Sequence, residues 1–234
     1  SRAPYLVPAA RTGARLGDSN LVDAMIHDGL WDAYSNQHMG MTGELVADKF
    51  DVDRDSQDSW ALLSHKRAAA AWSKGQFEAE TFPVEIPQKR GERMDFSQDE
   101  GVRGDLDLQT LANLRPAFKA DGSVTPGNAS QISDGAAAAV VASSEAVDSM
   151  GLEPLARITG YASGGTAPEM VMMAPQYAIE NLEARTGFSR HDFDLIEINE
   201  AFASGSCALM SSMGLDAEKV NVNGGAIAIG HPIG

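Results

Sequence analysis

Apolar and polar residues in the first half of the chain form short amphipathic runs separated by turn-forming residues. The spacing of these runs predicts a helix within residues 20–34 that stops at Gly29, helices at residues 42–50 and 54–74, and a strand at residues 81–87. Thr42 and Asp53 stand where helix caps are expected, because their side-chain oxygens can accept a hydrogen bond from the first turn. Residues 88–127 are rich in glycine, proline and charge, and we expect them to form loops.

From residue 135 onward, strands and helices are expected to alternate. Short apolar runs predict strands at residues 136–142, 156–161, 194–198 and 220–222. The segments between them predict helices at residues 145–150, 175–185 and 200–213, which end at Gly151, Gly187 and Gly214. Strands separated by helices are typical of a layered α/β fold.

The charge balance and the cysteine count exclude several classes of protein. The 234 residues include 18 basic and 33 acidic side chains, so the formal net charge is −15. A chain this acidic argues against a nucleic-acid binder, because phosphate contact needs a basic face. A single cysteine rules out an intramolecular disulfide framework and a thiolate metal cluster. No apolar run approaches the roughly 20 residues that span a bilayer.

The two ends of the chain indicate an internal piece of a longer protein. The chain begins at Ser1 without a methionine and ends at Gly234, directly after an apolar, glycine-rich run. Termini are usually polar and exposed, so we expect further residues on both sides. The alternative is a genuine, buried C-terminus.

Three segments have the residue types of a functional site. Residues 127–135 are polar and turn-forming, with a glycine at each end that would let the backbone approach a ligand. In residues 197–203 a strand ends on Asn199, where ligands of α/β sheets tend to bind, although Asn199 could simply cap the following helix. In residues 221–234, His231 lies between Gly230 and a proline, which restricts its backbone and helps to fix its ring. An imidazole held in this way can act as a general base or donate to an oxyanion.

The other histidines carry weaker signals. His38 directly precedes a predicted helix and is a further candidate for the site. His27, His65 and His191 have charged neighbours on predicted helices or at their edges, and we interpret them as surface residues. No pair of histidines has metal-ligand spacing with a carboxylate, so no metal site is expected.

These segments resemble the thiolase family. Asn-Glu-Ala-Phe at residues 199–202 is similar to a family box, residues 223–234 to its most specific signature, and residues 127–135 to its pantetheine loop. Shorter matches at residues 1–4, 38–40 and 114–118 follow in the right order, so the resemblance spans essentially the whole chain.

The resemblance implies a partial thiolase-like layered α/β fold with an inserted loop domain. Residues 1–132 would form the coenzyme A-binding loop domain of the N-terminal half, and residues 133–151 the last strand and helix of that half. Residues 152–234 would form part of the C-terminal half. The family usually assembles as homodimers or homotetramers, which we expect of the complete protein.

Thiolases make or break a carbon–carbon bond next to a thioester through an acyl-cysteine intermediate. By resemblance, His231 would activate the nucleophile and contribute to the oxyanion hole, Asn199 would hold a water facing the thioester oxygen, and His38 would line the site. The two catalytic cysteines of the family have no counterpart among these residues, and Cys207 is interpreted as a small buried hydrophobe. We therefore expect the 234 residues alone to be inactive.

The resemblance also implies residues that bind the coenzyme A thioester, which is expected as a substrate with no additional cofactor. Ser130 would contact the pantetheine and Arg103 the nucleotide end. The apolar walls would come from Leu30, Met39, Ile132, Ala201 and Phe202. Gln131 stands where glycine is frequent in biosynthetic members, which leaves the acyl-length preference open.

The leading hypothesis is an acetyl-CoA C-acyltransferase of the thiolase class, cytoplasmic and acting in fatty acid metabolism. Within that class, a degradative 3-ketoacyl thiolase is the second possibility. The alternative from a different class is a non-catalytic thiolase-like protein that binds coenzyme A or lipid. An acidic interaction domain would leave His231 and Asn199 unexplained. Nucleic acid and membrane are not expected partners.

Overall fold

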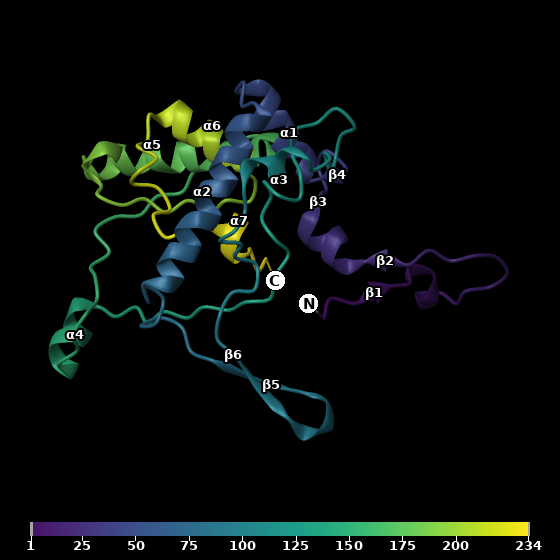
Figure 1. The fold of residues 1–234 in the computed structure, drawn as a ribbon, viewed down its shortest axis with the longest axis horizontal. Coiled ribbons are helices and arrows are strands. Elements are labelled where there is room, and N and C mark those ends of the chain that lie inside the picture. Colours follow the sequence, from purple (N-terminus) through teal and green to yellow (C-terminus); the bar gives the residue numbers. More distant parts are fainter. Residues whose placement is uncertain (1, 234) are drawn as a thin grey trace.

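Four helices pack together at the centre of the molecule (Figure 1). The computed structural model describes residues 2–233, so Ser1 and Gly234, which end two of the matched motifs, lie outside the described residues. Helix α6 (Ala203–Met213) contacts α1 (Gly40–Lys49) and α2 (Arg54–Ser73), and α2 also contacts the short helix α7 (Ala226–Ile229). This packing brings segments that are far apart in the sequence to one place.

Helix α2 confirms the prediction made from Asp53. The Asp53 side chain accepts a hydrogen bond from the backbone N–H of Ser56 at 2.8 Å, and the helix runs from Arg54 to Ser73. Its inner face buries Trp60, Ala61 and other residues against Ala203, Val220 and Ile227. A second apolar cluster joins α1 and α6 to the 3₁₀ helix Pro168–Met173.

Two predictions about the first helices were wrong in detail. Helix α1 begins at Gly40, and Thr42 lies inside its first turn, where its hydroxyl donates to the carbonyl of Met39 instead of capping the helix. The helix predicted within residues 20–34 is only the π-helix Met25–Leu30, because short strands flank it, and Gly29 lies inside this helix and does not stop it.

The helices that were predicted to stop at glycine do so. Helix α4 (Ser144–Met150) and helix α5 (Ala174–Thr186) end at Gly151 and Gly187, and α6 ends at Gly214. These glycines have φ of 62–76°, a left-handed conformation that favours glycine at helix ends. Helix α3 (Leu108–Ala112) was not predicted, because the sequence around it is rich in loop-forming residues.

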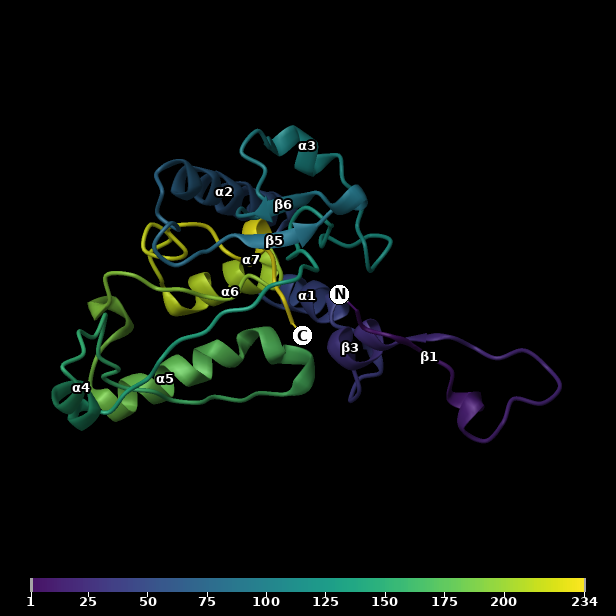
Figure 2. The same ribbon diagram turned by 90° about the horizontal axis from the view of Figure 1, so that it is seen from below.

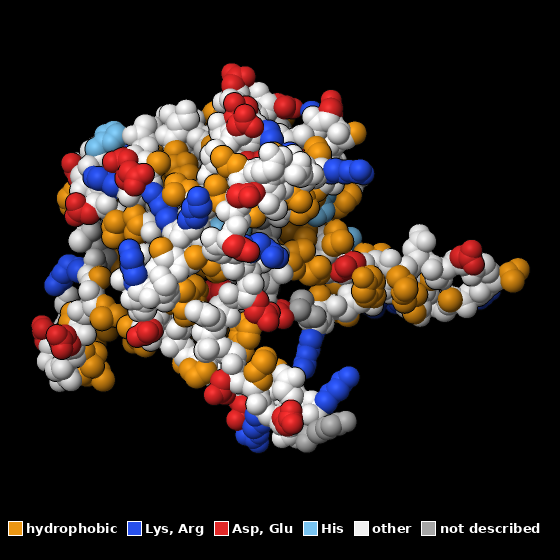
Figure 3. All heavy atoms as spheres, viewed as in Figure 1, with side chains coloured by type: hydrophobic (Ala, Val, Ile, Leu, Met, Phe, Trp, Pro, Cys, Tyr) orange, Lys and Arg blue, Asp and Glu red, His pale blue; other side chains and the backbone are white. Residues whose placement is uncertain are grey.

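Between residues 2 and 233, the strands form three antiparallel pairs. These are β1 (Tyr5–Leu6) with β2 (Val22–Asp23), β3 (Trp31–Asp32) with β4 (Gln37–His38), and β5 (Val84–Pro87) with β6 (Arg93–Phe96). The β5 strand confirms the alternation seen at residues 81–87, whereas its partner β6 lies in a region predicted as loop. The β1–β2 arm projects from the helices in both views (Figures 1 and 2), and the β5–β6 hairpin projects from them in Figure 1. Hydrophobic side chains are exposed along the arm (Figure 3), and Tyr5, Leu6 and Val7 are among the exposed apolar residues.

The four apolar runs predicted as strands in the second half form no regular strand. Residues 136–142 and 156–161 form no strand, and Val140 is 96 % exposed. Residues 194–198 and 220–222 meet only at one parallel bridge between Ile196 and Val220. A strand requires a neighbouring strand to satisfy its backbone groups, and the described residues offer these runs no further partner.

Among residues 2–233, the 3₁₀ helix Pro8–Arg11 follows β1, Lys89–Gly91 lies between β5 and β6, and Arg190–Asp192 follows α5. Between residues 2 and 233, no helix combines the length and the apolar character that crossing a membrane requires.

Candidate active site

His231 and Asn199 meet at the surface, although 31 residues separate them in the sequence. The Nδ2 atom of Asn199 lies 3.4 Å from the Nε2 atom of His231. This distance exceeds the 2.7–3.2 Å that is usual for an N–H donor and its acceptor, so the two groups are adjacent and weakly bonded at most. When Nε2 carries a proton, both nitrogens are donors and can bind one oxygen atom together.

The backbone fixes the position of His231. Gly230 has φ of 99°, which favours glycine, and the following histidine N–H donates to the carbonyl of Gln131 at 3.1 Å. A Cβ at position 230 would overlap the hydroxyl oxygen of Ser133. The ring is half-buried and the Asn199 side chain is exposed, so a substrate can reach both.

A buried carboxylate holds the loop that leads to His231. Glu200 is fully buried and accepts hydrogen bonds from the Ser64 hydroxyl (2.7 Å), the Asn221 amide (2.8 Å) and the Ile227 N–H (3.2 Å). The carboxylate lies so close to Gly225 that a Cβ there would overlap it. In the sequence this glutamate is visible only as part of a motif, since nothing in its neighbours indicates that it is buried.

Asn221 joins the glycine-rich loop to the segment that carries Asn199. Its side chain accepts from the N–H of Ile198 at 2.8 Å and donates to the Ile198 carbonyl at 2.9 Å. Asn221 has φ of 47°, a conformation that asparagine tolerates better than most residues. The interpretation of Asn199 as a helix cap is wrong, because α6 begins at Ala203 and its N-cap position is Phe202.

His38 belongs to a stack of aromatic rings. Its ring lies 4.8 Å from that of Phe118 at an interplanar angle of 24°, and Phe118 meets Phe202 edge-on at 6.0 Å. The N–H of Gly40 donates to His38 Nδ1 at 3.0 Å, and burial lowers the pKa of the imidazole. A neutral ring with Nδ1 as acceptor carries its proton on Nε2, which is then a donor.

The predicted pantetheine loop pairs directly with the Asn-Glu-Ala-Phe segment. The N–H of Ser130 donates to the carbonyl of Ala201 at 3.0 Å, and the N–H of Ala203 donates to that of Asn128 at 2.8 Å. Ala129 and Phe202 form an antiparallel bridge. The structure therefore brings together Ser130, Ala201 and Phe202, three of the residues expected to bind the thioester.

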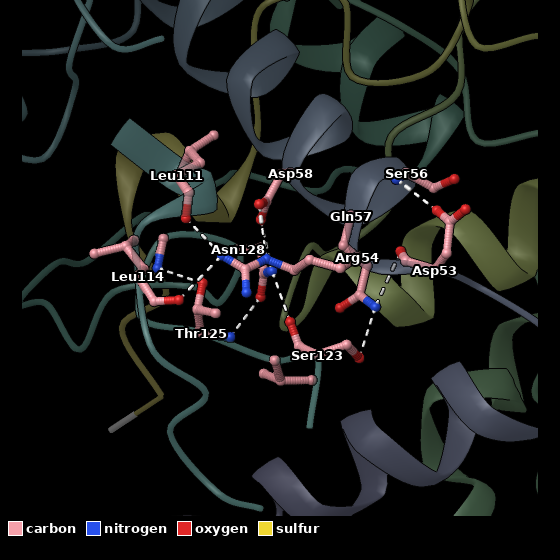
Figure 4. A network of polar contacts seen from close by, with 12 residues as sticks. Asp53, Arg54, Ser56, Gln57, Asp58, Leu111, Leu114, Ser123, Thr125 and Asn128 are labelled. Atoms are coloured by element: carbon pink, nitrogen blue, oxygen red, sulfur yellow. Dashed lines mark hydrogen bonds and ion pairs between the residues drawn. The ribbon is translucent and has the colours of Figure 1, made fainter. Parts of the chain in front are cut away.

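A polar network anchors this loop to α2 (Figure 4). Asp58 accepts hydrogen bonds from Arg54 Nε at 2.7 Å and from the buried Asn128 amide at 2.9 Å. The Asn128 carbonyl oxygen accepts from the N–H of Thr125 at 2.8 Å. Gln57 adds a bond from its amide to the Ser123 hydroxyl at 2.9 Å. These hydrogen bonds hold the loop against α2.

The remaining predicted binding residues lie around this centre with less direct contacts. The N–H of Met39 donates to the carbonyl of Leu30 at 2.8 Å, and both side chains are half-buried. The Arg103 side chain is exposed, and its backbone N–H donates to Nδ1 of His65 at 3.2 Å. Ile132 is 60 % exposed.

A cavity of about 540 Å³ lies beside the loops. Its walls include Ile132, Ser133, Gly29 and Pro232, but none of His231, Asn199 and His38. The cavity therefore adjoins the predicted site and does not contain its polar groups.

The structure corrects one further interpretation. His65 is 4 % exposed and is not a surface residue, and burial, together with the Arg103 charge, lowers the pKa of its imidazole. At Gly127, a Cβ would overlap the side chains of Leu111 and Leu114, so packing inside the protein is a second reason for a glycine there. Among residues 2–233, no group of three His, Cys, Asp or Glu side chains could hold a metal ion.

Cys207 has the properties of an unreactive thiol. Burial, with smaller contributions from the Glu200 and Asp53 carboxylates, raises its pKa to about 12. At pH 8 such a thiol is about 10⁻⁴ ionised, so we expect iodoacetamide to alkylate it at least roughly 100-fold more slowly than it alkylates glutathione. The measurement is a mass-spectrometric time course. The same thiol should react at the ordinary rate in urea, and equal rates for the folded protein and glutathione would contradict this description.

Two family models match the chain. "Thiolase, N-terminal domain" matches residues 1–145, and "Thiolase, C-terminal domain" matches residues 152–234. An acetyl-CoA acetyltransferase of Pseudomonas aeruginosa is 48 % identical over all 234 residues, and a probable acetyl-CoA acyltransferase of Staphylococcus aureus is 44 % identical. The chain spans about 60 % of the length of each of these relatives.

Solved structures give the same result. The crystal structure of the Bacillus anthracis acetyl-CoA acetyltransferase superimposes with a TM-score of 0.95 at 40 % identity. The match covers 98 % of this chain and 58 % of the Bacillus anthracis chain. The human mitochondrial 3-ketoacyl-CoA thiolase in complex with CoA superimposes with a TM-score of 0.93 at 42 % identity, over all of this chain and 58 % of its own.

Proposed function

Because this chain belongs to the thiolase family and has its α/β fold, we propose that the protein it comes from is an acetyl-CoA C-acyltransferase. Such an enzyme condenses two acyl thioesters or cleaves a 3-ketoacyl thioester through an acyl-cysteine intermediate. The observation that carries the proposal is the 3.4 Å approach of His231 and Asn199, two nitrogen-bearing side chains at an accessible surface.

The chemistry of the two side chains suits a thioester. When a thiolate attacks the thioester carbon, the carbonyl oxygen becomes an oxyanion and needs hydrogen-bond donors. His231 Nε2, and a water held by Asn199, would supply them, and the tetrahedral intermediate would then expel the coenzyme A thiolate. The proposal assigns the nucleophile to a cysteine other than Cys207, since a thiol with a pKa near 12 is almost fully protonated at neutral pH.

The proposed substrate is a small-molecule acyl-CoA, and no resident cofactor is required. Ser130 and Arg103 would hold the pantetheine and the nucleotide, while Leu30, Met39 and Phe202 with their neighbours Ile132 and Ala201 would form apolar walls. The support is the CoA complex of the human relative and the direct pairing of Ser130 with the Asn199 segment.

We extend the proposal to a cytoplasmic homodimer or homotetramer that acts in fatty acid metabolism. This extension rests on the family resemblance alone. Light scattering coupled to gel filtration tests the oligomeric state.

The proposal is tested by thiolysis of 3-ketoacyl-CoA substrates. We expect the protein made from the complete reading frame to cleave acetoacetyl-CoA in the presence of CoA, with a loss of absorbance of the magnesium enolate. A series of longer 3-ketoacyl-CoA substrates distinguishes a biosynthetic from a degradative preference. The 234-residue chain with its single cysteine should be inactive.

The competing function is non-catalytic binding of coenzyme A or lipid by the same fold. Saturable CoA binding by the complete protein without any turnover would establish it. Turnover by residues 1–234 that is abolished by Cys207→Ala would contradict our assignment of the nucleophile.

A further inference from the structure

One side chain connects three segments of the site. The Gln131 amide nitrogen lies within donating distance of the carbonyls of Gly101 (3.2 Å), Ile227 (3.1 Å) and Ala228 (3.2 Å). An amide group has two N–H donors, so the three carbonyls share them. Two of these acceptors belong to α7 and the third to the loop that carries Arg103.

The bonds to α7 satisfy carbonyls that the helix leaves open. Helix α7 has only four residues, and its last carbonyls have no partner further along the helix. The Ala226 carbonyl accepts a hydrogen bond from the N–H of Gly230, whereas the carbonyls of Ile227 and Ala228 accept from the Gln131 amide. The end of α7 is therefore held by a residue of another segment.

The same residue holds His231 through its backbone. The N–H of His231 donates to the carbonyl of Gln131 at 3.1 Å, so Gln131 contacts the chain on both sides of Gly230. Gly230 has a positive φ, and bonds on both sides define the bend that directs the imidazole.

The bond to Gly101 connects this bend to the loop of Arg103. The Arg103 N–H is bonded to the buried His65, and a Cβ at Gly101 would overlap the Gln131 amide. Ser130, the residue before Gln131, is bonded to Ala201. Gln131 is thus in contact with the His231 loop and the Arg103 loop, and it adjoins the predicted pantetheine residue.

We propose that Gln131 is a positioning residue that couples the loop expected to bind the coenzyme A nucleotide to the orientation of His231. This inference rests on the proposed function for its catalytic consequences. Its physical part, the coupling of the two loops, does not depend on turnover.

The first test measures backbone hydrogen exchange in the complete protein. Gln131→Met keeps the volume of the side chain and removes its donors. We expect exchange to accelerate about tenfold both in residues 226–231 and in residues 101–104, while α5 remains unchanged. Gln176→Met, which removes an amide from α5 that is bonded to Glu180, is the matched control and should leave both segments as they are. Unchanged exchange in the two segments of Gln131→Met would overturn the proposal.

The second test uses a side chain that can donate a hydrogen bond only when it is protonated. In Gln131→Glu the protonated carboxyl group donates one hydrogen bond, whereas the carboxylate places negative oxygens against three carbonyls. We expect the ratio of its kcat to that of the unmodified protein to fall about tenfold between pH 6 and pH 8, as the burial-raised pKa of the new group is passed. Glu100, Arg103 and His231 are the charged or ionisable residues of the contacting segments, and they are present in both proteins whose kcat values form the ratio.

The two variants separate this inference from the proposed function. In Gln131→Met we expect kcat to fall and KM for CoA to rise together. The ratio of the kcat of this variant to that of the unmodified protein should not depend on pH. A pH-independent ratio in Gln131→Glu would contradict donation by residue 131, and this arm applies even if Gln131→Met fails to fold. If the unmodified protein turns over no acyl-CoA, the proposed function fails, and the exchange experiment still decides whether Gln131 couples the loops.

Discussion

Replacing His231 with alanine should lower kcat for acetoacetyl-CoA thiolysis by about 10³-fold in the complete protein. A positioned general base contributes roughly 10²–10⁴-fold, and loss of one oxyanion donor costs roughly 10²–10³-fold. The ring is placed beside Asn199 by Gly230 and by the Gln131 carbonyl, so no other side chain of the loop can replace it. The measurement is steady-state kinetics with the folded state checked by circular dichroism.

Two further variants sharpen this result. His231→Asn keeps an N–H donor without a base and should lose less activity than the alanine variant. His191→Ala changes an exposed histidine of the 3₁₀ helix Arg190–Asp192 and should leave kcat unchanged. A His231→Ala protein with kcat within tenfold of the unmodified protein would remove the imidazole from the mechanism.

Replacing Glu200 with alanine should lower the free energy of unfolding by about 3–5 kcal/mol, because hydrogen bonds to a charged group contribute about 1.5–3 kcal/mol each and are not additive. The substitution leaves Ser64, Asn221 and the Ile227 N–H without their shared acceptor inside the protein. The loss also frees the loop that carries His231, so we expect kcat to fall in the fraction that remains folded. Urea unfolding followed by tryptophan fluorescence gives the stability change.

The matched control is Glu197→Ala. Glu197 lies three residues before Glu200 on the same segment and is exposed, so its removal should change the free energy of unfolding by less than about 0.5 kcal/mol. Equal effects of the two substitutions would show that Glu200 has no special structural role.

Local signals in the sequence predicted the helices well. Asp53 predicted the start of α2 because a cap needs only one side chain and three following residues. Glycines 151, 187 and 214 predicted three helix ends because glycine readily adopts the left-handed conformation that ends a helix. The apolar runs at residues 136–142 and 156–161 predicted strands that did not form, because strand pairing depends on a neighbour that local sequence does not describe.

The site was predicted only in part. The proximity of His231 and Asn199 was anticipated from two motifs, and the structure places them 3.4 Å apart. The buried carboxylate of Glu200 and the contacts of Gln131 were missed, since their importance depends on partners up to 136 residues away. His65 was predicted to be a surface residue because its sequence neighbours are charged. Its side chain is buried and accepts a hydrogen bond from the backbone N–H of Arg103, which the local sequence does not indicate.

The most direct test of the account is a crystal structure of the complete protein with a non-reactive acyl-CoA analogue. We predict that the oxygen standing for the thioester carbonyl binds within about 3.2 Å of His231 Nε2 and contacts a water held by Asn199. An analogue bound with that oxygen on other residues, and with His231 and Asn199 facing solvent, would contradict the account.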